Sequence, residues 1–211
     1  MREYNVMIIL LKHQKQICWH NFISYIFCLI FFLCTTLQTL AHETKPAIAE
    51  IVFKNKNDFE LNISCNIELI LDKILHQEHQ RHHEDKNTEF YNELRKLSPD
   101  DLNSEFVNVS KKFFSRAHLK ENGIPLKLKI INVHIPAPGN LSLIRVSRIS
   151  LKGSLTENAK SLTWSWSKEL GDSVIRLKKP HTSSGKIKLI YSAYLRNGKE
   201  SESMLHFGSN Q

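Results

Sequence analysis

The stretch DFELNISCNIELIL, Asp58 to Leu71, alternates apolar and polar side chains. Six apolar residues stand at every second position: Phe59, Leu61, Ile63, Cys65, Ile67 and Leu69. This period of two predicts a β-strand with one buried face. A shorter strand is predicted just before it at Pro46 to Lys54, and Asn55 to Asn57 between the two predict a hairpin turn.

Downstream of this run the periodicity becomes helical. His76 to Lys86 holds no apolar residue, whereas apolar residues recur at helical spacing in Glu89 to Leu97. Ser98-Pro99-Asp100-Asp101 is typical of a helix start, because serine caps and proline suits the first turn. One apolar helical face follows, consisting of Leu102, Phe106, Val109 and Phe113. We therefore predict a short two-helix insertion at about 87–117.

Strand patterns resume after Asn122-Gly123, a hairpin-type dipeptide. The alternation through Leu126 to Ile130 slips by one residue at Ile131-Asn132, which predicts a β-bulge. Glycine-punctuated strands are then expected at Leu141–Leu151, Ser161–Ser167, Ser173–Lys179, Lys186–Arg196 and Ser201–Phe207. Short strands at this spacing favour a mainly β, immunoglobulin-like β-sandwich over residues 42–211.

Residues 1–41 have the features of an export segment. Phe22 to Leu33 is apolar, Arg2, Lys12 and Lys15 precede it, and Thr39-Leu40-Ala41 suits a cleavage site. Cleavage would leave His42 as the first residue. Alternatively the segment is an uncleaved signal anchor, since a run of this length can span a bilayer as one transmembrane helix. Both interpretations place residues 42–211 outside the cytoplasm, in a periplasmic or similar compartment.

The chain is basic, with 29 Lys+Arg and 21 Asp+Glu, a net charge of +8. Three of the basic residues and one acidic residue precede residue 42, which leaves +6 for the remainder. These charges are scattered, so we do not expect nucleic-acid binding. No nucleophile elbow, phosphate loop or dinucleotide fingerprint occurs in the sequence, and we therefore expect no enzyme activity.

Three of the four cysteines lie in the export segment, and only Cys65 follows it. A single cysteine cannot form an intrachain disulfide, so we predict a buried, inert thiol. Trp164 and Trp166 are two apart on a predicted strand and share one face, which favours core packing.

The candidate metal ligands are histidines. His76, His79, His82 and His83 gather with acidic residues in a short polar segment, and imidazole binds nickel, cobalt, copper or zinc. The alternative is a solvated polar linker, because such tracts bind metal without enforced geometry.

After cleavage, His42 would offer a second kind of metal site. Its free α-amine and its imidazole could chelate one ion together, with His118, His134 or His206 as a further ligand. The alternative is a frayed, solvated terminus.

Four segments carry a resemblance to a known family: AHETKPAIAEIVF at residues 41–53, YNELRKLSPDDLNSEF at 91–106, LTWSWSKELGDSVIR at 162–176 and YSAYLRNGKESESM at 191–204. Together they resemble the exported N-terminal region of bacterial HupE/UreJ-type proteins, which are nickel/cobalt permease-like. The family's multi-helix membrane half is not among the residues that match.

The resemblance implies an exported, non-enzymatic accessory domain that assists a separate multi-span membrane permease for nickel or cobalt. Two alternatives stay open. One is a structural or protein-interaction module without metal. The other is a copper-chaperone-like protein that binds through the mature N-terminal His42.

Overall fold

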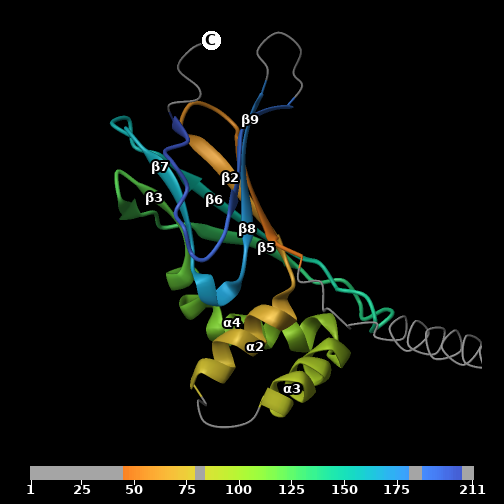
Figure 1. Cartoon of the computed structure of the whole chain (residues 1–211). Coiled ribbons are helices and arrows are strands. Elements are labelled where there is room, and N and C mark those ends of the chain that lie inside the picture. Colours follow the sequence, from red (N-terminus) through yellow and green to blue (C-terminus); the bar gives the residue numbers. More distant parts are fainter. Residues whose placement is uncertain (1–44, 79–83, 181–186, 206–211) are drawn as a thin grey trace, which may run out of the picture. The chain divides into compact units, whose positions relative to one another are not determined.

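The computed structural model of the chain describes residues 45–78, 84–180 and 187–205. Residues from Lys45 onward form one compact unit (Figure 1). Within the described residues the strands are β1 (Ala47–Phe53), β2 (Asp58–Cys65), β3 (Ala117–Glu121), β4 (Ile124–Pro125), β5 (Lys129–His134), β6 (Ser147–Ser154), β7 (Leu162–Trp166), β8 (Ser173–Pro180) and β9 (Ile187–Leu195). The helices are α2 (Ile67–Glu78), α3 (Glu84–Lys96), α4 (Pro99–Arg116) and the 3₁₀ turn η1 (Lys168–Leu170).

The strands form two sheets. The larger has the order β5-β6-β2-β1-β8-β9, and the smaller has the order β4-β3-β7. All neighbours are antiparallel except β1 and β8, which run parallel with Ile51 opposite Leu177. The fold is therefore the predicted mainly β sandwich.

One hydrophobic core joins both sheets and the helices. Alternate residues of β1 and β2 are buried, and the predicted helical face of α4 is buried in full. Trp164 and Trp166 of β7 are stacked at 5.8 Å and almost completely buried, which confirms their predicted core role. Because the core residues that the structure describes run from Ala47 to Met204 and already join both sheets and the helices, we expect residues 45–211 to fold without the preceding segment.

The two helices predicted at about 87–117 are present as α3 and α4, but a third helix, α2, was not predicted and precedes them after β2. The strand expected to continue to Leu71 ends at Cys65, and α2 begins at Ile67. Asn66 causes this change: its side-chain oxygen accepts from the backbone N–H of Leu69 at 3.0 Å and caps the helix. The apolar residues then follow a helical period, with Ile67, Ile70, Leu71 and Ile74 buried.

Two predicted strand limits are also wrong. Residues 141–146 are a loop, and β6 starts only at Ser147. The strand expected at Ser201–Phe207 is absent as far as Leu205, where the described residues end. Instead, the backbone N–H groups of Ser201 and Met204 donate to the carbonyl oxygens of Trp164 and Leu162.

Three local predictions are confirmed. The register of β5 against β6 shifts between Ile130 and Asn132, where the bulge was expected. Asn122 and Gly123 both have positive φ, as a tight hairpin requires. Ser98 caps α4, with its hydroxyl oxygen accepting from the backbone N–H of Asp101.

The two ends of the sandwich differ. At one end, which we call the helix end, β2 passes into α2, Ala47 starts β1, and Cys65 pairs with Ser147. The helices lie at this end (Figure 1). The opposite end holds the turns at residues 54–57 and 122–123. In the described part of the chain, no helix is both long enough and apolar enough to cross a membrane.

Candidate functional site

The predicted metal ligands fall largely outside the described residues. His42, His79, His82, His83 and His206 lie outside them, and His76 is in the last turn of α2, beside the gap. Among the residues that the structure describes, no group of three or more His, Cys, Asp or Glu side chains is arranged to hold a metal ion. The metal sites at His42 and at His76–His83 stay predictions.

The two other histidines considered as ligands occupy different sheets. His118 is half-buried in β3, and His134 is exposed in β5. Burial lowers the pKa of His118, and the neighbouring Lys120 lowers it further.

Cys65 is buried and reduced, as predicted. Burial raises the pKa of its thiol to about 12, and the nearby Glu68 carboxylate adds to the effect. A thiol that stays protonated in this way is a poor nucleophile.

The candidate site is the connection between β5 and β6, residues 135–146, which we call the apolar loop. It reads IPAPGNLSLIRV and contains one charged residue, Arg145, and no acidic residue. A turn at Asn140 shapes it, because the Asn140 side-chain oxygen accepts from the backbone N–H of Ser142 at 2.9 Å. Figure 1 shows the loop at the helix end of the larger sheet.

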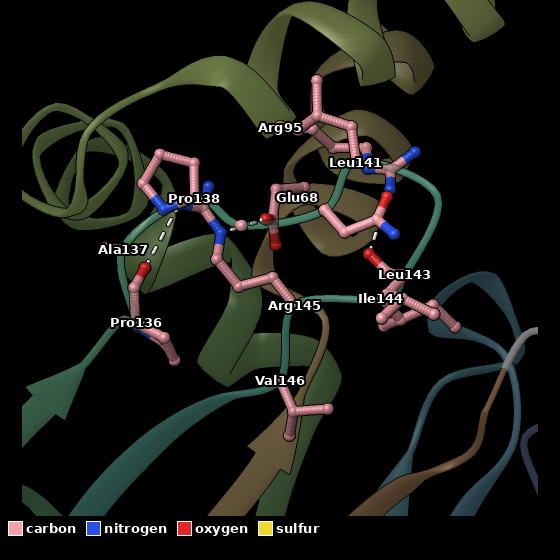
Figure 2. A pocket seen from close by; sticks show the side chains of 12 residues that line it. Glu68, Arg95, Pro136, Ala137, Pro138, Leu141, Leu143, Ile144, Arg145 and Val146 are labelled. Atoms are coloured by element: carbon pink, nitrogen blue, oxygen red, sulfur yellow. Dashed lines mark hydrogen bonds and ion pairs between the residues drawn. The ribbon is translucent and has the colours of Figure 1, made fainter.

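A buried ion pair fastens this loop to the helices. The Nε of Arg145 donates to Oε1 of Glu68 in the first turn of α2 at 2.6 Å, and the two side chains are only 8% and 1% exposed. The Nη atoms of Arg145 also donate to the carbonyl oxygens of Leu94, Leu97 and Pro136. Arg145 thus joins α2, the C-terminal end of α3 and the loop itself. Figure 2 shows its ion pair with Glu68.

The donors of Arg145 are engaged within the protein, so this guanidinium has little capacity left to bind an anion. Oε2 of Glu68 is buried and accepts no hydrogen bond from any described residue. The loop and these side chains line a small pocket of about 280 Å³ that is open to solvent, formed by Glu68, Arg95 and residues 136–141 and 143–146 (Figure 2). The ion pair is therefore best understood as a positioning device for the loop.

The loop presents apolar side chains to solvent. Leu141, Leu143 and Val146 are 43%, 66% and 50% exposed. The backbone carbonyl of Leu143 is held in place, since Nη2 of Arg95 donates to it at 3.0 Å. Apolar side chains fixed in an exposed position are typical of an interaction surface.

Basic side chains stand at the base of the loop. His134, the last residue of β5, faces Arg148 of β6 directly across the strands, and both are exposed. No ion pair between described residues involves either of them. An exposed arginine without a counter-ion among the described residues favours binding of an anionic partner.

Sequence reasoning missed this site because Leu141 to Leu151 was assigned to a single strand. One signal was available. The run LSLIRV at residues 141–146 directly follows Pro-Ala-Pro-Gly-Asn. An arginine within this mostly apolar run is hard to place on a regular strand.

Comparison of the chain with protein-family models and with curated proteins finds no match. The fold and the site therefore define a class only: a mainly β sandwich domain with a helical insertion and an apolar loop fixed by a buried ion pair.

Proposed function

We propose that the chain is a non-enzymatic, extracytoplasmic accessory domain that assists a membrane transport partner for nickel or cobalt. The export segment at residues 1–41 supports the placement outside the cytoplasm. The resemblance to the exported region of HupE/UreJ-type proteins supports the partner.

The observation that carries the proposal is the apolar loop. An enzyme needs polar groups converging on a cavity. Here the polar pair beneath the loop is occupied with holding it, and the loop's exposed surface is apolar. Such a surface suits binding better than chemistry.

Metal accumulation in cells that make this chain tests the proposal. Deletion of the chain should lower nickel or cobalt accumulation, and the wild-type chain should restore it. Leu143→Asp, which places a charge on the loop, should restore less than the wild type. Ile124→Asp is the matched control, since Ile124 is 70% exposed at the opposite end of the sandwich. Unchanged metal accumulation after deletion would overturn the proposal.

Calorimetric titration of the mature domain with nickel, cobalt, copper and zinc separates the metal hypotheses. Binding that an extra residue before His42 abolishes would favour the copper-chaperone-like alternative. Binding that survives this extension but is lost when His79 and His83 become Gln would favour the histidine cluster. If no metal binds more tightly than about millimolar, the hypothesis that remains is a structural or protein-interaction module without metal.

A further inference from the structure

We propose that the apolar loop and the basic side chains around it seat the helix end of the sandwich on an anionic lipid surface. This rests on the proposed function in one respect, the placement of the domain outside the cytoplasm at a membrane.

The first argument is the rigidity of the loop. Leu143 is 66% exposed although its backbone is held by Arg95 and by a hydrogen bond from its own N–H to the Asn140 carbonyl. Leu141 and Val146 flank it on the same loop. A short, fixed group of apolar side chains can enter the boundary between lipid headgroups and acyl chains without an ordering cost.

The second argument is charge. The guanidinium of Arg95 lies at the loop, and Arg148 lies at its base beside His134. The loop has no acidic residue to repel a negatively charged headgroup. Glu93, the nearest acidic neighbour of Arg95 along α3, is paired with Lys96 at 2.7 Å. Each basic side chain close to an anionic membrane favours binding by about 1 kcal/mol, a factor of roughly five.

Sedimentation with lipid vesicles tests this inference on residues 45–211, which contain all the described core residues and lack the apolar run at 22–33, which could itself bind lipid. We expect binding to vesicles of equimolar phosphatidylcholine and phosphatidylglycerol, weaker binding to phosphatidylcholine alone, and loss at high salt. Leu143→Asp should weaken binding about tenfold or more, because a leucine is withdrawn from lipid. Arg148→Gln should weaken binding to the anionic vesicles about fivefold.

Ile124→Asp is again the matched control and should bind like the wild type. Equal effects of Leu143→Asp and Ile124→Asp would overturn the inference. Equal binding of the wild type to both kinds of vesicle would also overturn it, and so would a lack of binding to either kind. A concentration-dependent dimer that Leu143→Asp abolishes, without vesicle binding, would instead assign the loop to a second copy of the chain. Since these vesicles contain no protein partner, failure here and failure of the accumulation test are independent results.

Discussion

Arg145 connects three segments of the fold, and its side chain is almost completely buried. Its partners are a carboxylate on α2, two carbonyls at the end of α3 and one carbonyl in the apolar loop. Bringing both charges out of water is costly, so such a pair contributes more to a single arrangement of the loop than to net stability. Removing one partner is different, because the other charge is left buried alone.

We predict that Arg145→Met lowers the free energy of unfolding by about 3–5 kcal/mol, measured by urea denaturation. The double variant Arg145→Met/Glu68→Met should recover much of this loss, since no lone buried carboxylate remains. Arg176→Met is the control. Its ion pair with Glu50 at 3.3 Å is partly exposed, so its loss should stay below about 1 kcal/mol. Comparable losses for the two single variants would contradict a buried, coupled role for Arg145.

His118 gives the domain a predicted sensitivity to acid. Burial and Lys120 hold its pKa below the ordinary value of 6.5, and hydrogen bonds to the backbone of Phe114 and Ser115 oppose this only in part. The unfolded chain therefore binds the proton more readily than the folded one. The stability contributed by His118 is present above pH 6.5 and is lost as the pH falls toward the lowered value.

We predict that His118→Gln reduces the loss of thermal stability when the pH is lowered from above 6.5 to below it. Melting temperatures of the wild type and the variant across this range provide the measurement. Identical slopes of melting temperature against pH would contradict this prediction, because Glu50 and Glu200, whose pKa values lie below the usual 4.5, stay ionised around pH 6.5.

At the scale of elements, the helical insertion depends on its starting residues. Asn66 ends β2 and begins α2 within one residue, and its side-chain N–H₂ also donates to the hydroxyl of Tyr91 on α3. Ser98 likewise caps the N-terminus of α4, which follows α3 after a very short connection. Both caps satisfy backbone N–H groups that the first helical turn leaves without partners.

We predict that Ser98→Ala destabilises the domain by about 1 kcal/mol, because the N–H of Asp101 loses its acceptor. The matched control is Ser104→Ala on the exposed face of the same helix. The Ser104 hydroxyl only donates to the carbonyl of Asp100, and alanine favours the helix, so little change or a slight gain is expected. Urea denaturation of both variants is the measurement, and equal losses would argue against the cap.

At the scale of the molecule, the two sheets and the helices share one core. Phe113 of α4 contacts Trp166 of β7 edge-to-face at 6.0 Å, so the insertion cannot separate from the smaller sheet without exposing aromatic surface.

We therefore predict that residues 45–211 fold alone and unfold in a single cooperative transition. Tryptophan fluorescence, which reports on Trp164 and Trp166 of β7, and far-ultraviolet circular dichroism, dominated by the helices, should give coincident denaturation curves. Two separate midpoints would mean that the insertion is an independent folding unit.

Much of the fold follows from local patterns in the sequence. Alternation predicted β1, β2, β7, β8 and β9, although the strand predicted for β2 ran on to Leu71, and the phase slip at Ile131-Asn132 predicted the bulge. The helical face of α4, its Ser98 cap and the Asn122-Gly123 turn were equally local. Each of these features depends on residues only a few positions apart. Their spacing and backbone preferences favour the same local structure irrespective of the rest of the chain.

The remaining features depend on contacts between distant residues. An apolar residue at Ile67 suits a strand or a helix equally, and only packing on the core, with Asn66 as cap, selects the helix. The parallel pairing of β1 with β8 and the Arg145–Glu68 ion pair join residues more than 70 positions apart. By itself, the sequence determined the single cysteine after residue 41 and the β-rich class. Only the tertiary structure decided that residues 135–146 form an exposed apolar loop, because burial and charge pairing depend on which distant segments meet.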